Sequence, residues 1–112
     1  MPWQVSFYPP DSDESPVARY IEDLPVPTQN KVLKTIRLLR ELGNRLPRPH
    51  SKPLSGGLFE LRTSGKGAQR IYYAFLPGQK VVLLNAVAKG RSEDAAIALA
   101  RERLKKLRET RP

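Results

Sequence analysis

The chain has 112 residues, no cysteine, a single histidine and a formal net charge of +9. This length suits one domain covering residues 1–112, and a chain without cysteine can form neither disulfides nor thiolate metal sites. No stretch approaches the roughly 18 apolar residues of a membrane span, and the N-terminus lacks the pattern of a signal peptide. We therefore expect a cytoplasmic protein with no metal, no cofactor and no membrane partner.

Positive charge is concentrated beyond residue 30. Residues 1–30 carry one Arg against five carboxylates, whereas residues 31–112 carry 19 Lys or Arg against six carboxylates. A basic region of this kind attracts polyanions by contacting their phosphates. RNA, DNA and anionic membranes all fit this pattern, and the alternative is that the charge serves only solubility.

The N-terminal part of the chain predicts one strand and two helices. Apolar and polar residues alternate over residues 3–8, which predicts a strand near a sheet edge that stops at two prolines. A helix is expected from Pro16 to about Leu24, with Ser15 as its N-cap, and a second helix from about Pro27 to residue 42. Joined by a short link, the two helices should form an antiparallel pair that covers one face of a sheet. Residues 45–53 contain three prolines and are interpreted as an extended loop.

Three antiparallel strands and a last helix are predicted next. The first strand ends at Arg62, the second covers residues 69–75 and the third covers residues 81–87. The third is apolar enough to be buried on both faces at the centre of the sheet. Ser92 is expected to cap the final helix. The fold class is thus α+β, in the order strand, helix, helix, three strands, helix. Alternation assigns Phe59 to the core and places Arg62, Arg70 and Tyr72 together on an open sheet face.

Several motifs in the second half of the chain resemble a known family. They are Leu54-Ser-Gly-Gly-Leu-Phe-Glu-Leu-Arg62, then Gln69-Arg-Ile-Tyr-Tyr73, an apolar strand, and the basic turn Lys89-Gly-Arg91. This succession resembles the RelE/ParE-superfamily toxins, and within them the HigB-like, phage-protein-related branch of type II toxin–antitoxin systems. The resemblance implies a RelE-like β-α-α-β-β-β-α fold.

The resemblance also implies a function and partners. It points to a metal-independent, ribosome-dependent mRNA endoribonuclease that inhibits translation, with the ribosome, mRNA and a cognate helix-turn-helix antitoxin as partners. Two alternatives remain open at this point. One is a ParE-like inhibitor that binds DNA gyrase, and the other is a non-catalytic RNA-binding module.

Cleavage of RNA by attack of a 2′-hydroxyl, leaving a 2′,3′-cyclic phosphate, requires a base, an acid and donors that stabilise the phosphorane. Arg62 and Arg70 suit stabilisation, because a guanidinium offers paired donors to a phosphate. Lys89 suits an acid or a base, because Arg91 beside it would disfavour its charged form. The resemblance adds that RelE-like ribonucleases keep catalytic groups at the start of the second core strand and in the basic turn after the third.

A second set of residues is predicted to contact RNA. Tyr72 could stack on an unpaired base, as aromatic side chains of RNA-binding proteins do. The other members of this set are Lys66, His50, Arg101 and Lys105. His50 could also act as a general base, which the resemblance permits, but a lone loop histidine is more often a solvated residue. Arg62 and Arg70 could equally be solvated strand residues paired with Glu60.

Overall fold

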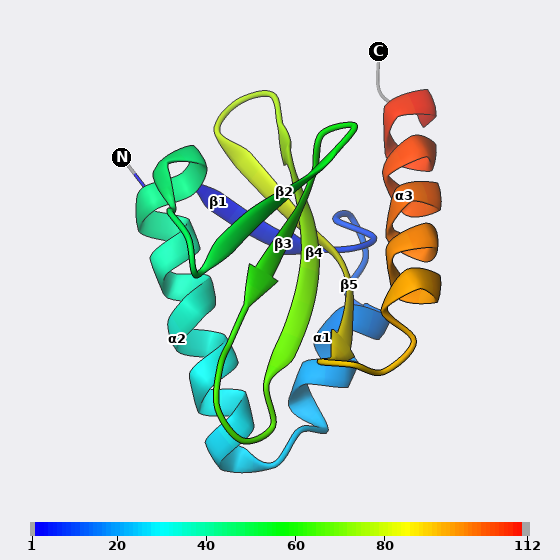
Figure 1. The fold of residues 1–112 in the computed structure, drawn as a ribbon. Helices are drawn as coiled ribbons and strands as arrows, with labels where there is room; N and C mark the ends of the chain where they lie inside the picture. Colours follow the sequence, from blue (N-terminus) through cyan, green and yellow to red (C-terminus); the bar gives the residue numbers. More distant parts are fainter. Residues whose placement is uncertain (1, 111–112) are drawn as a thin grey trace.

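The computed structural model describes residues 2–110 and shows a five-stranded sheet between helices (Figure 1). The strand order is β1-β5-β4-β3-β2, with β1 parallel to β5 and every other neighbouring pair antiparallel. The elements are β1 (Gln4–Phe7), α1 (Pro16–Glu22), α2 (Val26–Leu42), the 3-10 helix η1 (Gly43–Arg45), β2 (Ser51–Ser55), β3 (Leu58–Arg62), β4 (Gln69–Leu76), β5 (Lys80–Ala88) and α3 (Glu93–Thr110). The α+β class and the predicted order of helices are confirmed.

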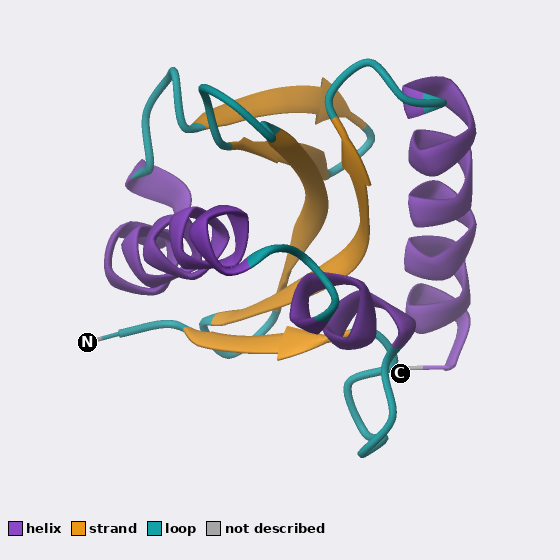
Figure 2. Ribbon diagram, turned by 90° about the horizontal axis from the view of Figure 1, so that it is seen from below, coloured by secondary structure: helices purple, strands orange, loops and turns teal. Residues whose placement is uncertain are grey.

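Helices cover both faces of the sheet (Figure 2). Helices α1 and α2 pack on one face through residues such as Val17, Ile36 and Leu39, which confirms the expected helix pair. Helix α3 packs on the other face through Ala100 and Leu104. The prediction of an open second face is therefore wrong, because the chain returns across it after β5.

Local signals set the ends of the first two helices. The Ser15 side chain accepts hydrogen bonds from the backbone N–H groups of Val17 and Ala18, which caps α1 as predicted. Helix α2 ends at Gly43, whose φ of +55° favours glycine. A Cβ on Gly43 would collide with the indole ring of Trp3, so this position also requires the absence of a side chain.

Strand β2 is not predicted by the sequence pattern. Residues 45–53 were interpreted as a loop throughout, but β2 begins at Ser51 and pairs with β3 in the register Ser51↔Leu61 and Pro53↔Phe59. Proline is tolerated here because β2 is the last strand of the sheet, so its outer edge needs no N–H donor.

The other strands follow the prediction, apart from the identity of the central one. Val81, Val82, Leu83 and Leu84 of β5 are fully buried, alternating between the two helix layers. β1 lies at the sheet edge as expected, but the centre belongs to β4, because β5 has only β1 beyond it. Within residues 2–110, no helix is both long and apolar enough to span a bilayer.

Candidate functional site

Three predicted site residues lie in one row across neighbouring strands. Arg62 of β3 is paired in register with Arg70 of β4. The backbone N–H of Arg62 donates to the carbonyl oxygen of His50, 2.8 Å away, which directly precedes β2. Residues in such a row project from the same face of a sheet. The β-sheet therefore brings His50, Arg62 and Arg70 together at one end.

Arg70 is a buried structural residue rather than a solvated one. It is 7% exposed, and its Nη1 donates to the carbonyl oxygens of Thr63 and Gln69, each 3.0 Å away. Its Nε lies 3.9 Å from the Glu60 carboxylate. The expectation of an Arg70 side chain free on an open face is wrong, because the β3–β4 connection folds its carbonyl groups onto the guanidinium.

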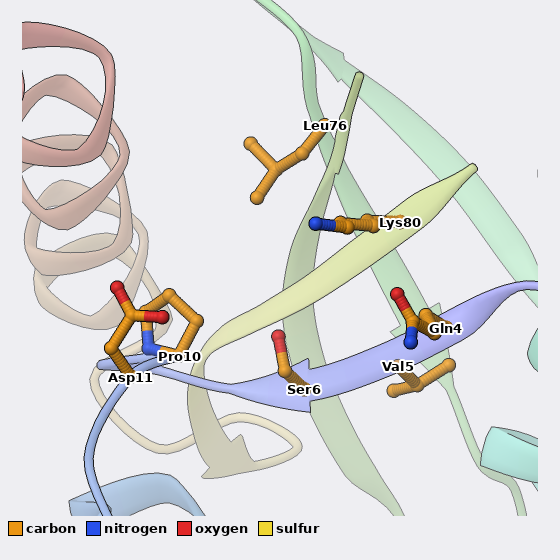
Figure 3. A pocket seen from close by; sticks show the side chains of 7 residues that line it. All are labelled: Gln4, Val5, Ser6, Pro10, Asp11, Leu76 and Lys80. Carbon is orange, nitrogen blue, oxygen red and sulfur yellow. The ribbon is translucent and has the colours of Figure 1, made fainter. Parts of the chain in front are cut away.

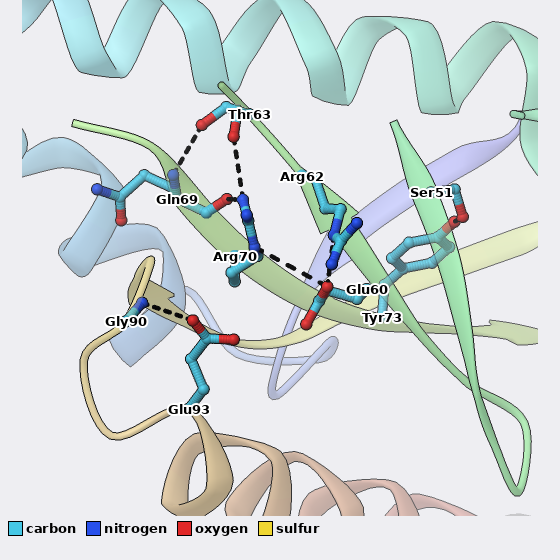
Figure 4. A network of polar contacts seen from close by, with 9 residues as sticks. All are labelled: Ser51, Glu60, Arg62, Thr63, Gln69, Arg70, Tyr73, Gly90 and Glu93. Carbon is cyan, nitrogen blue, oxygen red and sulfur yellow. Dashed lines mark hydrogen bonds and ion pairs between the residues drawn. The ribbon is translucent and has the colours of Figure 1, made fainter. Parts of the chain in front are cut away.

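Arg62 is the arginine of the row that a ligand can reach. Its Nε donates to Glu60 Oε1 at 2.7 Å, and its side chain is 34% exposed, whereas that of Glu60 is 5% exposed (Figure 4). Within residues 2–110 the two terminal nitrogens of Arg62 have no hydrogen-bond partner. Glu60 therefore fixes the guanidinium and leaves its outer donors available.

Tyr72 is fully buried beneath α3 and belongs to that hydrophobic cluster. It cannot be the base-stacking platform that alternation suggested, because no part of its ring is accessible. Its hydroxyl is buried without a hydrogen-bond partner among the described residues. Burial above all, and then the nearby Glu60 carboxylate, raises the pKa of Tyr72 far above its ordinary value. The hydroxyl therefore remains protonated at physiological pH.

A hollow of about 250 Å³ opens beside Arg62, between α2 and the β3–β4 connection. We call it the cationic hollow; its lining consists of Lys31, Lys34, Thr35, His50, Arg62, Thr63, Ser64 and Gly65. None of these described residues carries a carboxylate. Lys31 also reaches the β3–β4 connection, donating from Nζ to the Ser64 carbonyl oxygen at 3.4 Å. The hollow thus combines positive charge with hydroxyl and backbone donors, which suits a phosphate.

Lys31 and Lys34 were not predicted as site residues. Their three-residue spacing places them on one side of α2, which the sequence shows. Their approach to His50 and Arg62 depends on how α2 lies along the sheet, and no local sequence pattern predicts the position of a helix on a sheet.

Lys66, Lys89 and Arg91 surround the same end of the sheet. Lys66 is exposed in the β3–β4 connection, and the backbone N–H of Lys89 donates to the Ala68 carbonyl oxygen at 2.9 Å. Burial raises the pKa of Tyr20, and the positive charge of Arg91 lies close enough to oppose that rise. Arg91 itself is exposed. All three are therefore accessible near the row formed by His50, Arg62 and Arg70.

Arg101 and Lys105 lie elsewhere. Both are exposed on α3, and Arg101 donates to the carbonyl oxygens of Leu54 and Ser55 at the β2–β3 turn. That turn follows β2, whereas His50 precedes it, so Arg101 is at the opposite end of this strand from the cationic hollow. The structure does not bring these two residues into the site.

Another hollow, beside β1, contains none of the predicted site residues (Figure 3). Its lining combines both signs of charge, with Lys80 on one side and Asp11 on the other. It therefore lacks the uniform positive charge of the cationic hollow.

Comparison with known proteins identifies the family of the chain. No curated protein shows significant similarity to the chain. Residues 19–105, most of the chain, match the model of the phage-derived protein Gp49-like family (DUF891). This is a family of RelE/HigB-like toxins, which implies an antitoxin partner. With this match, an α+β fold consistent with the RelE type, and a basic site at the sheet end, the chain belongs to the Gp49-like family.

Proposed function

We propose that this chain is the toxin of a type II toxin–antitoxin pair and cleaves mRNA on the ribosome. One observation carries the proposal. A backbone hydrogen bond joins Arg62 to His50 just before β2, and both residues line a hollow whose described lining also contains two lysines and no carboxylate. An imidazole can serve as the base and a guanidinium as the donor that stabilises the phosphorane in phosphodiester cleavage by a 2′-hydroxyl.

RNA phosphates would be held by charge and by directed donors. Lys31 and Lys34 attract the backbone into the hollow, and the outer nitrogens of Arg62 donate to the non-bridging oxygens of the scissile phosphate. Because Glu60 already fixes Arg62 Nε, little rotamer entropy is lost when the phosphate binds. Arg70 acts through Glu60 and Thr63 as a positioning residue.

The reaction follows from these positions. His50 takes the proton of the 2′-hydroxyl, and the 2′ oxygen forms a bond to phosphorus while the bond from phosphorus to the 5′ oxygen breaks. Arg62 stabilises the extra negative charge of the phosphorane. The departing 5′ oxygen takes up a proton from a neighbouring ammonium group or from water. The products are a 2′,3′-cyclic phosphate and a free 5′-hydroxyl. No step requires a metal ion.

The family and the charge also suggest how the toxin is restrained. A helix-turn-helix antitoxin with acidic side chains would associate rapidly with a surface that carries Lys31, Lys34, Lys66, Lys89 and Arg91. Its binding over the cationic hollow would exclude the ribosome.

The experiment is primer extension on cellular mRNA after the chain is induced, beside the variants His50→Gln and Arg62→Gln. Each variant should reduce cleavage at least about 100-fold, the scale of losing a general base or one stabilising donor. Lys80→Gln is the matched control, an exposed lysine of the hollow beside β1, and should cleave normally. Thermal melting verifies that the variants fold.

Two outcomes would contradict the proposal. Intact mRNA together with gyrase-linked DNA breaks would identify the chain as a gyrase inhibitor. Full cleavage by both variants would show that the catalytic centre lies outside the cationic hollow.

A further inference from the structure

A hollow of about 230 Å³ lies on the α1/α2 side of the sheet, next to η1. We call it the aromatic hollow, because one wall is formed by the rings of Phe59, Tyr73 and Phe75. Asn44, Arg48 and Ser51 also line it. Apolar ring surface with a few polar groups is the usual composition of a small-molecule site.

The three aromatic rings are in mutual contact, and Tyr73 is fully buried, whereas Phe59 and Phe75 are partly accessible. Phe59 stacks on Tyr73 with ring centroids 5.5 Å apart, and Phe75 meets Phe59 edge to face at 5.2 Å. Phe59 and Phe75 are only partly buried and pack against the core cluster. Rings fixed in this way offer planar surface to a flat ligand at little entropic cost, which is how proteins bind unstacked bases.

Polar groups around these rings match the edge of a nucleobase. The hydroxyl groups of Ser51 and Tyr73 are hydrogen-bonded to each other at 2.6 Å. Both side chains are buried, so this bond satisfies two hydroxyl groups that solvent and ligand reach little, and the accessible donors come from neighbouring residues. The amide of Asn44 and the guanidinium of Arg48 line the hollow and supply these donors.

The aromatic hollow adjoins the cationic hollow along the chain. His50 lines the cationic hollow and the next residue, Ser51, lines the aromatic one, with Cα atoms about 3.8 Å apart. A single RNA strand that places a phosphate beside His50 can therefore turn its neighbouring base into the aromatic hollow.

We propose that the aromatic hollow binds one unpaired nucleobase of the RNA strand whose phosphate occupies the cationic hollow. This inference rests on the proposed function and adds a base-binding subsite to it. The base is held by its flat face against Phe59 and Phe75 and by its edge through the exposed side chains of Asn44 and Arg48.

The single tryptophan of the chain provides the test. The Trp3 ring lies 5.1 Å from that of Phe75 and packs on Gly43, which also lines the aromatic hollow. The probe is a 2′-O-methyl trinucleotide, which has no 2′-hydroxyl to react, and its reference is the same molecule with an abasic central position. The base-containing probe should change Trp3 fluorescence saturably, and the abasic one should bind about tenfold more weakly.

Arg48→Gln should weaken binding of the base-containing probe about tenfold. Arg45→Gln is the matched control, since Arg45 is exposed in η1 and does not line the hollow, and it should change binding less than about twofold. Equal binding of the two probes, or equal effects of the two substitutions, would overturn the base-binding site. Cleavage of cellular mRNA is measured separately. If the chain does not cleave mRNA but its fluorescence still responds to the base, the nuclease function is refuted and the base-binding site remains supported.

Discussion

Replacing Arg70 with methionine should destabilise the fold by about 3 kcal/mol. Methionine keeps an unbranched stem and removes only the guanidinium. A hydrogen bond to a charged donor is worth about 1.5–3 kcal/mol, and Arg70 makes two, to the carbonyl oxygens of Thr63 and Gln69. Removing one partner of a buried ion pair costs about 3–5 kcal/mol. The low end applies because Glu60 keeps its shorter 2.7 Å contact with Arg62.

Urea unfolding followed by circular dichroism measures this cost. Lys89→Met is the control, because Lys89 is an exposed cation at the same end of the sheet and its loss should stay within about 0.5 kcal/mol. Equal slopes of free energy against urea would show that both variants begin from comparably folded states. If Arg70→Met unfolds at the same urea concentration as Lys89→Met, the buried contacts of the Arg70 guanidinium do not stabilise the fold.

Two further substitutions test buried features of the core. Tyr72→Phe removes the hydroxyl that lacks a partner and should stabilise the fold by about 1 kcal/mol in urea unfolding at pH 7. Because burial raises the folded-state pKa of Tyr72 above its ordinary 10.0, the unfolded chain loses this proton before the folded chain does, so stability is unaffected below pH 10 and falls as the pH rises further. The variant should thus lose less stability between pH 9 and about 11 than the unsubstituted chain, and an identical alkaline decline would contradict the assignment. Gly43→Ala should cost about 2–4 kcal/mol, because its φ is positive and its Cβ displaces the Trp3 ring. Gly90→Ala, with φ of +81° and nothing within 4 Å of the added Cβ, should cost only about 1–2 kcal/mol, and equal costs would show that Trp3 yields freely.

The elements with strong periodicity could be predicted from the sequence. Alternation identified β1, β3 and β4, and apolar spacing identified all three α-helices, because each pattern reflects a face that local geometry must bury. Strand β2 was missed because Pro49 and Pro53 mark irregular backbone in most contexts. Only its place at the sheet edge, which depends on the whole topology, makes Pro53 compatible with a strand.

The site could be predicted only in part. Strand register placed Arg62 and Arg70 on one face, and this is correct. Alternation does not show what covers a face, so it could not predict that α3 buries Tyr72 or that the β3–β4 connection folds over Arg70. The contribution of Lys34 likewise depends on how α2 approaches the β3–β4 connection, which is a tertiary contact between segments about 30 residues apart.

Helix α3 uses much of its positive charge to hold the fold together. Arg101, Arg103 and Arg108 each donate to backbone carbonyl oxygens, at the β2–β3 turn or on β5, and the Arg103 guanidinium also lies 5.4 Å from the centre of the Tyr8 ring. A cation already engaged by the protein releases few counterions when RNA binds. For single strands, the logarithm of the affinity falls by about 0.7 per tenfold rise in salt for each phosphate that the protein neutralises. The salt dependence of RNA binding should therefore be shallower than the number of basic residues suggests. Neutralising the arginines of α3 should weaken the packing of this helix on the β2–β3 hairpin more than it weakens RNA binding.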